Sequence, residues 1–173
     1  MDEMGMGSFS RNGYGGKPVS NPIDTDYFPG GSSGGSAAAV RDYQAMGALG
    51  TDTGGSVNYP AHCNGLFSMK PSFGRVSRFG QILYSSSNET TGPLGHSIND
   101  IYSIFHTMQG VDQNDSNCID FRHISKMRYA DRVLEQGLDA PGLLEGLRVG
   151  IMDEFNIAEL DERNRNVQQL FID

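Results

Sequence analysis

The sequence predicts an α/β fold in which short strands alternate with helices. Three observations point to it: a helix-forming run at 36–49, short apolar runs at 65–69 and 75–79, and an amphipathic helix pattern at 97–110. Alternation of this kind is typical of α/β domains. With 173 residues, of which 37% are hydrophobic, the chain is long enough for one globular domain with its own core.

The first half of the chain combines loop and regular elements. Residues 1–36 are rich in Gly, Ser, Asn and Pro, so we expect a long ordered loop there. Residues 36–49 are dominated by Ala and other helix formers, which predicts a helix that begins on the glycine-serine run before it. The runs at 65–69 and 75–79 are predicted strands, separated by a proline and a glycine.

The second half opens with the clearest helix signal. Ser97 is a predicted N-cap with Asp100 at the N3 position, apolar residues recur at helical spacing, and Gly110 ends the pattern. Beyond it we expect polar loop over 111–146 with a helical turn near 127–136, a strand at 147–152 and an amphipathic helix at 161–172. Both ends of the chain fall within predicted structural elements, which indicates that the sequence is a piece of a longer protein.

Composition excludes several functional classes. A formal charge of −8 and a pI near 4.8 argue against a surface that binds nucleic acid by itself, so any RNA would be held by a partner. No stretch approaches the roughly 20 apolar residues of a membrane span. The histidines and cysteines lack metal-ligand spacing, and Cys63 and Cys118 are interpreted as free thiols in a reducing compartment.

Two glycine-serine runs, at 29–36 and 50–56, are the candidate chemistry. Hydroxyl nucleophiles need a base and hydrogen-bond donors for the oxyanion. The second run could supply both a nucleophile, Ser56, and the donors, because glycines let backbone N–H groups converge on one point. The segment between the runs could bring Ser32 of the first run against the second.

Three simpler interpretations compete. A phosphate-binding loop needs a lysine after its final glycine, whereas Gly35 is followed by Ser36. Residues 30–34 match the G-x-S-x-G pattern of a nucleophile elbow, but the residues before them do not form the apolar strand that the elbow requires. Taken singly, each run could also be an ordinary turn.

Together the runs at 30–39 and 50–56, Gly65 and the segment 70–78 resemble the amidase signature family, and most closely the A subunits of glutamyl-tRNA(Gln) amidotransferase within it. Supporting matches extend from Asp2-Glu3 to the strand that begins at Gly146, so the resemblance covers nearly the whole chain. The chain covers well under half of a family domain. Many relatives have an arginine where this chain has Asn58, and the family pattern has an aspartate where this chain has Glu89.

The resemblance implies a fold and a set of site residues. The fold is an amidase-signature α/β fold with a mixed β-sheet covered by helices. Residues 1–173 would be a partial domain, incomplete at both ends, that lacks the N-terminal lysine-bearing part and the C-terminal part. Ser56 is implied as the nucleophile and Ser32 as a relay serine in a cis peptide. The oxyanion hole is implied to consist of the backbone N–H groups of Thr53, Gly54, Gly55 and Ser56.

The third member of the family triad, a lysine, has no match. Lys70 aligns with a lysine that the family uses structurally, and Lys17 and Lys126 fall in polar loops. These 173 residues alone are therefore expected to be inactive. Met6 and Ser8 are implied to line or gate the substrate pocket.

The resemblance also implies a reaction and partners. The parent would hydrolyse glutamine and supply ammonia for conversion of Glu-tRNA(Gln) to Gln-tRNA(Gln), with the tRNA held by a B subunit in a complex that a small C subunit completes. No cofactor is expected in this chain, since ATP and magnesium act on the partner, and no membrane partner is expected. The expected location is the mitochondrion, or else bacterial cytoplasm. The alternatives are a free-standing amidase acting on a small or lipid amide, and an inactive fragment without the catalytic lysine.

Overall fold

A computed structural model describes residues 1–120, 141–142, 145–146, 148 and 150. The chain divides into two compact units, Met1–Ser125 and Lys126–Asp173, and every element described below belongs to the first. The turn predicted near 127–136, the strand at 147–152 and the helix at 161–172 lie wholly or largely outside the described residues.

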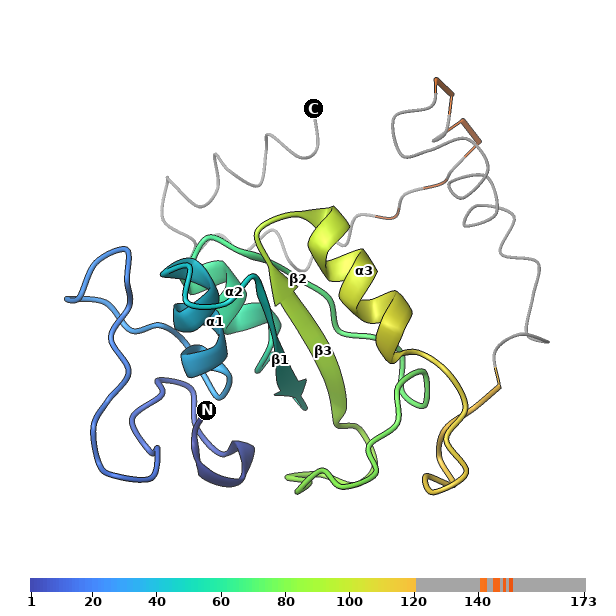
Figure 1. Ribbon diagram of the computed structural model, residues 1–173, viewed down its shortest axis with the longest axis horizontal. Coiled ribbons are helices and arrows are strands. Elements are labelled where there is room, and N and C mark those ends of the chain that lie inside the picture. The colour runs from blue at the N-terminus through green and yellow to red at the C-terminus, as the bar shows by residue number, and fades with distance from the viewer. Residues whose placement is uncertain (121–140, 143–144, 147, 149, 151–173) are drawn as a thin grey trace. The chain divides into compact units, whose positions relative to one another are not determined.

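The first unit is built on a small antiparallel sheet (Figure 1). Its strands are β1 (Gly47–Asp52), β2 (Phe67–Ser68) and β3 (Thr90–Gly95), in the order β1-β3-β2. The helices are α1 (Gly34–Arg41), α2 (Asn58–Cys63) and α3 (Ile98–Met108), with a 3₁₀ turn η1 at Glu3–Gly5. The α/β class is therefore confirmed. In the described part of the chain both strand pairings are antiparallel, so the parallel pairings of the expected mixed sheet are not seen there.

Helices pack on opposite faces of the sheet because neighbouring residues of β3 face opposite ways. Leu94 is fully buried and forms the core with Ala37 of α1 and with Val57 and Ala61 at α2. Gly95 faces α3, and a Cβ there would lie 2.8 Å from Asp100 Cβ. The absence of a side chain at Gly95 therefore lets α3 approach the sheet closely.

The start of α3 confirms the predicted cap. The Ser97 hydroxyl accepts from the Asp100 amide at 3.1 Å, and the Asp100 carboxylate accepts from the Ser97 amide at 2.8 Å. This reciprocal pair satisfies two N–H groups that a helix N-terminus otherwise leaves without partners. The helix ends at Met108, within two residues of the predicted stop at Gly110.

Three other predictions were wrong in extent. The helix predicted over 36–49 ends at Arg41, and Gly47–Leu49 belong to β1 instead. The cause is tertiary pairing: Ala48 and Leu49 pair with β3 opposite Leu94 and Pro93, which overrides their local helix preference. The strand predicted at 75–79 is reduced to one isolated bridge between Val76 and Gln109, and that at 65–69 to Phe67–Ser68.

Candidate functional site

The two glycine-serine runs meet in the structure. The first run leads into α1, and the second forms the turn between β1 and α2. The Ser33 amide donates to the Ser56 carbonyl at 3.2 Å, and the Ser33 hydroxyl lies 3.3 Å from both the amide and the carbonyl oxygen of Thr51. Ser33, which the sequence did not single out, is thus the residue that joins the runs and brings the backbones at Ser32 and Ser56 together.

Ser32 is fully buried at this junction. Its side chain is 0% exposed, and the peptide bond between Gly31 and Ser32 is cis, as the resemblance implies. Within the described residues, the Ser32 hydroxyl has no hydrogen-bond partner. A buried hydroxyl without a partner costs free energy, so such groups in native proteins call for an explanation such as a catalytic role.

Loop residues near the N-terminus hold the carbonyls on both sides of that peptide. The Asp2 amide donates to the Ser32 carbonyl at 2.9 Å, and the Ser10 hydroxyl donates to the Gly30 carbonyl at 2.7 Å. Both Asp2 and Ser10 are buried, and the Asp2 carboxylate accepts from the amides of Ser10 and Asn12. The loop predicted over 1–36 is therefore ordered by contacts that position the first serine run.

A buried carboxylate organises the second run. Asp52, the last residue of β1, is 0% exposed. Its Oδ1 accepts from the Gly55 amide at 2.8 Å, and its Oδ2 accepts from the Val57 amide at 2.7 Å and more weakly from the Asn58 amide at 3.3 Å. These bonds fold the chain around Ser56 into a fixed turn, because they anchor residues on both sides of it.

Lys70 completes this arrangement from outside the run. Its ammonium lies 2.9 Å from Asp52 Oδ1 and donates to the Thr53 carbonyl at 2.8 Å. Burial raises the pKa of Asp52, but the hydrogen bonds from Lys70 and from the amides of Val57 and Gly55 outweigh it, so the net pKa lies below the ordinary value of 3.8. The carboxylate is therefore ionised at neutral pH.

The predicted oxyanion donors divide into two groups. The Gly55 amide already donates to Asp52. This differs from the expectation for Gly55, since its N–H is committed to the carboxylate. The amides of Thr53, Gly54 and Ser56 make no hydrogen bond to any part of the chain that the structure describes. Gly54 is exposed, and no atom lies within 4 Å of the point where its Cβ would be, so this side of its α-carbon is open.

The two residues expected to line a substrate pocket lie in different surroundings. Ser8 is exposed, and its backbone packs against the first run: a Cβ on Gly31 would lie 2.8 Å from the Ser8 carbonyl carbon. Met6 is also exposed, and its carbonyl accepts from the Asn12 side chain at 3.4 Å. The structure thus brings Ser8 to the serine runs, whereas no hydrogen bond within residues 1–120 joins Met6 to them.

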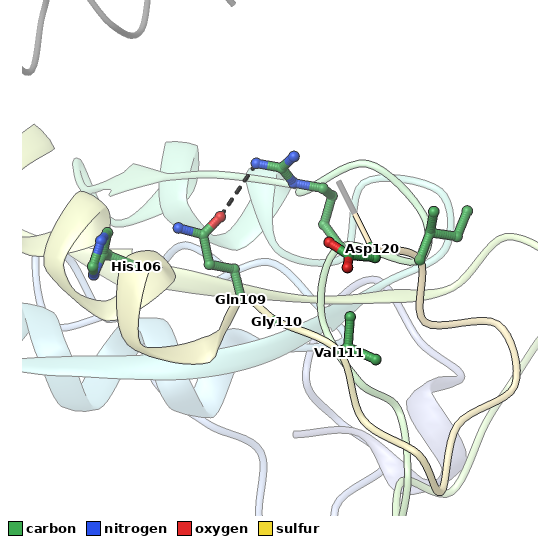
Figure 2. A pocket seen from close by; sticks show the side chains of 7 residues that line it. His106, Gln109, Gly110, Val111 and Asp120 are labelled. Atoms are coloured by element: carbon green, nitrogen blue, oxygen red, sulfur yellow. Dashed lines mark hydrogen bonds between the residues drawn. The ribbon is translucent and has the colours of Figure 1, made fainter. Parts of the chain in front are cut away.

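A separate pocket of about 580 Å³ lies beside the end of α3 (Figure 2). It is lined by an Arg75 guanidinium that donates to the Gln109 side chain at 3.2 Å, together with His106 and Asp120. Its lining includes no residue of either serine run.

Among the described residues, no group of three or more His, Cys, Asp or Glu side chains is placed to hold a metal ion. No helix within that part of the chain has the length and apolar character of a membrane span.

Both cysteines are free thiols, as predicted. Burial raises the pKa of the Cys63 thiol, and a hydrogen bond with Tyr59 opposes part of that rise. The Cys118 thiol donates to the Gly110 carbonyl at 2.8 Å. Both of these partners lie outside the two serine runs, so the surroundings of the thiols are structural.

Four site residues carry no assigned role at the sequence level: Asp52, Ser33, Asp2 and Ser10. Lys70 is expected to be structural, but its contact with the second serine run is not predicted. Asp52 stands inside the second run, so its position beside the glycines is a usable signal. The resemblance implies a structural lysine at position 70, but nothing in the sequence shows that its ammonium contacts the second serine run.

Comparisons with known proteins find relatives of this chain by sequence and by structure. A family model described as Amidase matches residues 1–173. The A subunit of glutamyl-tRNA(Gln) amidotransferase from Burkholderia thailandensis is 43% identical over 155 residues, which are 90% of this chain and 31% of that protein. The chain therefore spans about a third of the length of this relative.

Solved structures share the fold. The A subunit of the same enzyme from Thermotoga maritima has a TM-score of 0.65 at 33% identity, over 78% of this chain and 35% of that one. The native peptide amidase from Stenotrophomonas maltophilia has a TM-score of 0.64 at 34% identity, over 76% of this chain and 27% of that one. The amidase-signature fold predicted from the motifs is confirmed by these two likenesses.

Proposed function

The chain belongs to the amidase family, and from that premise we propose that it carries the nucleophile half of an acyl-transfer site that hydrolyses glutamine. The observation that carries the proposal is the junction of the two serine runs, in which the Ser33 amide bonds to the Ser56 carbonyl. The preceding residue, Ser32, is buried, and its hydroxyl has no hydrogen-bond partner within the described residues. A hydroxyl nucleophile beside a second hydroxyl and free backbone amides is suited to attack an amide carbonyl.

In the proposed reaction, the Ser56 oxygen attacks the amide carbon while its proton moves to the Ser32 oxygen, and the Ser32 proton passes on to the lysine base that the complete domain would supply. The negative charge that develops on the substrate oxygen is stabilised by the free amides of the second run, with Thr53, Gly54 and Ser56 as donors and Gly55 holding the turn through Asp52. The proton then returns through Ser32 to the amide nitrogen as the C–N bond breaks and ammonia leaves. Water gives up a proton along the same path as it attacks the acyl ester, so that glutamate is released and the Ser56 hydroxyl is restored. Met6 and Ser8 would border the substrate.

The physiological role that we propose is supply of ammonia for amidation of Glu-tRNA(Gln), with B and C subunits as partners. It is supported by the 43% identity to the A subunit from Burkholderia thailandensis. ATP and magnesium would act on the partner, and none is assigned to this chain. The mitochondrion remains our proposed location, with bacterial cytoplasm as the alternative.

The lysines of the sequence do not supply the family's base in this proposal. Lys70 is bound to Asp52 and the Thr53 carbonyl, Lys17 is exposed, and Lys126 lies outside the described residues. We therefore propose that the 173 residues tested alone hydrolyse no glutamine, which is the inactive-fragment alternative in its testable form.

The test places these residues in a complete domain. The segment replaces its counterpart in the Burkholderia thailandensis protein, and glutamate release from glutamine is measured with the B and C subunits present. The proposal expects Ser56→Ala to abolish turnover and Ser32→Ala to lower it by about 10²-fold or more. Ser36→Ala is the matched control, because its hydroxyl donates to the Leu49 carbonyl instead and turnover should persist. Full activity of Ser56→Ala would reject the proposal.

A free-standing amidase is the second candidate, favoured by the likeness to the peptide amidase from Stenotrophomonas maltophilia. The same chimera assayed with small amides and with glutamine, with and without the B subunit, separates the two. Dependence of glutamine turnover on the B subunit supports the amidotransferase. Turnover of small amides at the same rate with and without the B subunit supports the free-standing enzyme.

A further inference from the structure

We propose that Lys70 is a positioning residue that aims the Gly54 N–H at the substrate oxyanion. This inference rests on the proposed acyl-transfer function and deepens it, since it names the residue outside the second serine run that fixes a donor within it. Lys70 lies after β2, and its side chain reaches back 17 residues to the Thr53 carbonyl.

Peptide geometry transmits the contact. The only cis peptide in the described chain joins Gly31 and Ser32, so the Thr53–Gly54 peptide is trans. In a planar trans peptide the C=O and the following N–H point in opposite directions. The Lys70 ammonium, 2.8 Å from the Thr53 carbonyl, therefore turns the Gly54 N–H away from itself.

Gly54, whose amide lies on the far side of that peptide, is open to solvent. Gly54 is exposed, no atom lies within 4 Å of its would-be Cβ, and its amide has no acceptor in the described part of the chain. The Lys70 ammonium and the free Gly54 N–H thus lie on opposite sides of the Thr53–Gly54 peptide. This is the arrangement that a developing oxyanion requires, because a preorganised donor needs no reorientation during the reaction.

Asp52 fixes the lysine itself. Its Oδ1 lies 2.9 Å from the Lys70 ammonium and also accepts the Gly55 amide at 2.8 Å. The Thr53 carbonyl and the Gly55 amide are therefore both held by the Asp52–Lys70 ion pair. Because Gly54 lies between these two anchored groups, the Thr53–Gly54 peptide has little freedom to rotate. Lys70 contributes orientation rather than proton transfer, because its ammonium is committed to these two acceptors.

Two variants separate positioning from simple stability. Lys70→Met removes the ammonium and keeps the length of the side chain, whereas Lys70→Arg keeps a charged donor that can reach both acceptors. In the chimera we expect Lys70→Met to lower kcat by about 10- to 100-fold with KM changed less than about twofold, since a misaimed oxyanion donor affects the transition state. Lys70→Arg should recover much of kcat.

A second measurement uses the 173-residue chain itself and does not depend on turnover. Hydrogen bonding at a carbonyl alters the ¹⁵N shift of the following amide, so Lys70→Met in the ¹⁵N-glycine-labelled chain should shift the Gly54 signal. The Gly80 signal serves as the internal control, because it is exposed and makes none of these contacts.

The outcomes distinguish this inference from the function on which it rests. An unmoved Gly54 signal in Lys70→Met, or a chimera in which Lys70→Met raises KM and leaves kcat intact, overturns the role of Lys70 alone. Turnover that survives Ser56→Ala instead removes the proposed function. A shifted Gly54 signal together with a kcat loss that Lys70→Arg repairs supports both.

Discussion

Replacing Gly50 by alanine tests the packing that joins the two serine runs. Gly50 lies in β1, and an alanine Cβ there would lie 2.5 Å from Ser33 Oγ, 2.7 Å from Ser33 Cβ and 3.0 Å from Val57 Cγ2. Ser33 is buried, and its hydroxyl and amide are held by Thr51 and Ser56. It therefore has no space into which to retreat.

The magnitude follows from these contacts. Forcing an extra carbon into a packed core typically costs about 1–3 kcal/mol. Displacing Ser33 also weakens its bonds to Thr51 and Ser56, at about 0.5–1.5 kcal/mol each. We therefore expect Gly50→Ala to lower the free energy of unfolding by about 2–6 kcal/mol, measured by urea denaturation followed by circular dichroism.

Gly54→Ala is the matched control. Its new Cβ would meet no atom within 4 Å, and Gly54 is not among the glycines with positive φ. The free energy of unfolding should change by less than about 1 kcal/mol. Equal urea midpoints for Gly50→Ala and the unchanged chain would refute the described contact between the runs.

Three further outcomes are expected. Ser97→Ala should lower the free energy of unfolding by about 0.5–2 kcal/mol in the same urea assay, because it removes one half of the capping box of α3, and a loss no larger than that of an exposed serine would contradict the cap. Because the pKa of Asp52 is depressed below 3.8, the ionised carboxylate stabilises the fold above that pH, and this stabilisation is lost as the pH falls further. The urea midpoint of Asp52→Asn should therefore depend less on pH between about 6 and 3 than that of the unchanged chain, and an equal dependence would count against the ion pair. Tyr59→Phe removes the hydrogen bond that lowers the pKa of Cys63, so iodoacetamide should alkylate Cys63 more slowly at about pH 8 while the Cys118 rate stays the same, and a faster Cys63 reaction would reverse the assignment.

Local signals predict those elements that depend on few neighbours. Helix α3 is predicted within two residues because its cap, its apolar spacing and its terminating glycine are all local. Strand β1 escapes prediction because Gly47–Asp52 contains no β-branched residue before Thr51 and follows closely on an alanine-rich segment. Its pairing with β3, a segment more than 35 residues away, decides its conformation.

The site divides in the same way. Ser32 and Ser56 can be singled out because glycine-serine runs with this spacing resemble a family pattern, and the structure brings their backbones together through Ser33. The Asp52–Lys70 pair cannot be predicted, because an ion pair depends on where a flexible side chain ends. A lysine before a proline looks the same in sequence whether it is solvated or bound.

The identity of the serine that acts as the nucleophile tests the central claim most directly. The chimera is treated with a fluorophosphonate that forms a stable covalent adduct with activated serines, and the modified peptide is identified by mass spectrometry. We predict one adduct at Ser56, formed much more slowly in Ser32→Ala and at an unchanged rate in Ser36→Ala. An adduct on another serine, or labelling of Ser56 that is indifferent to Ser32, would contradict a site in which the two hydroxyls act together.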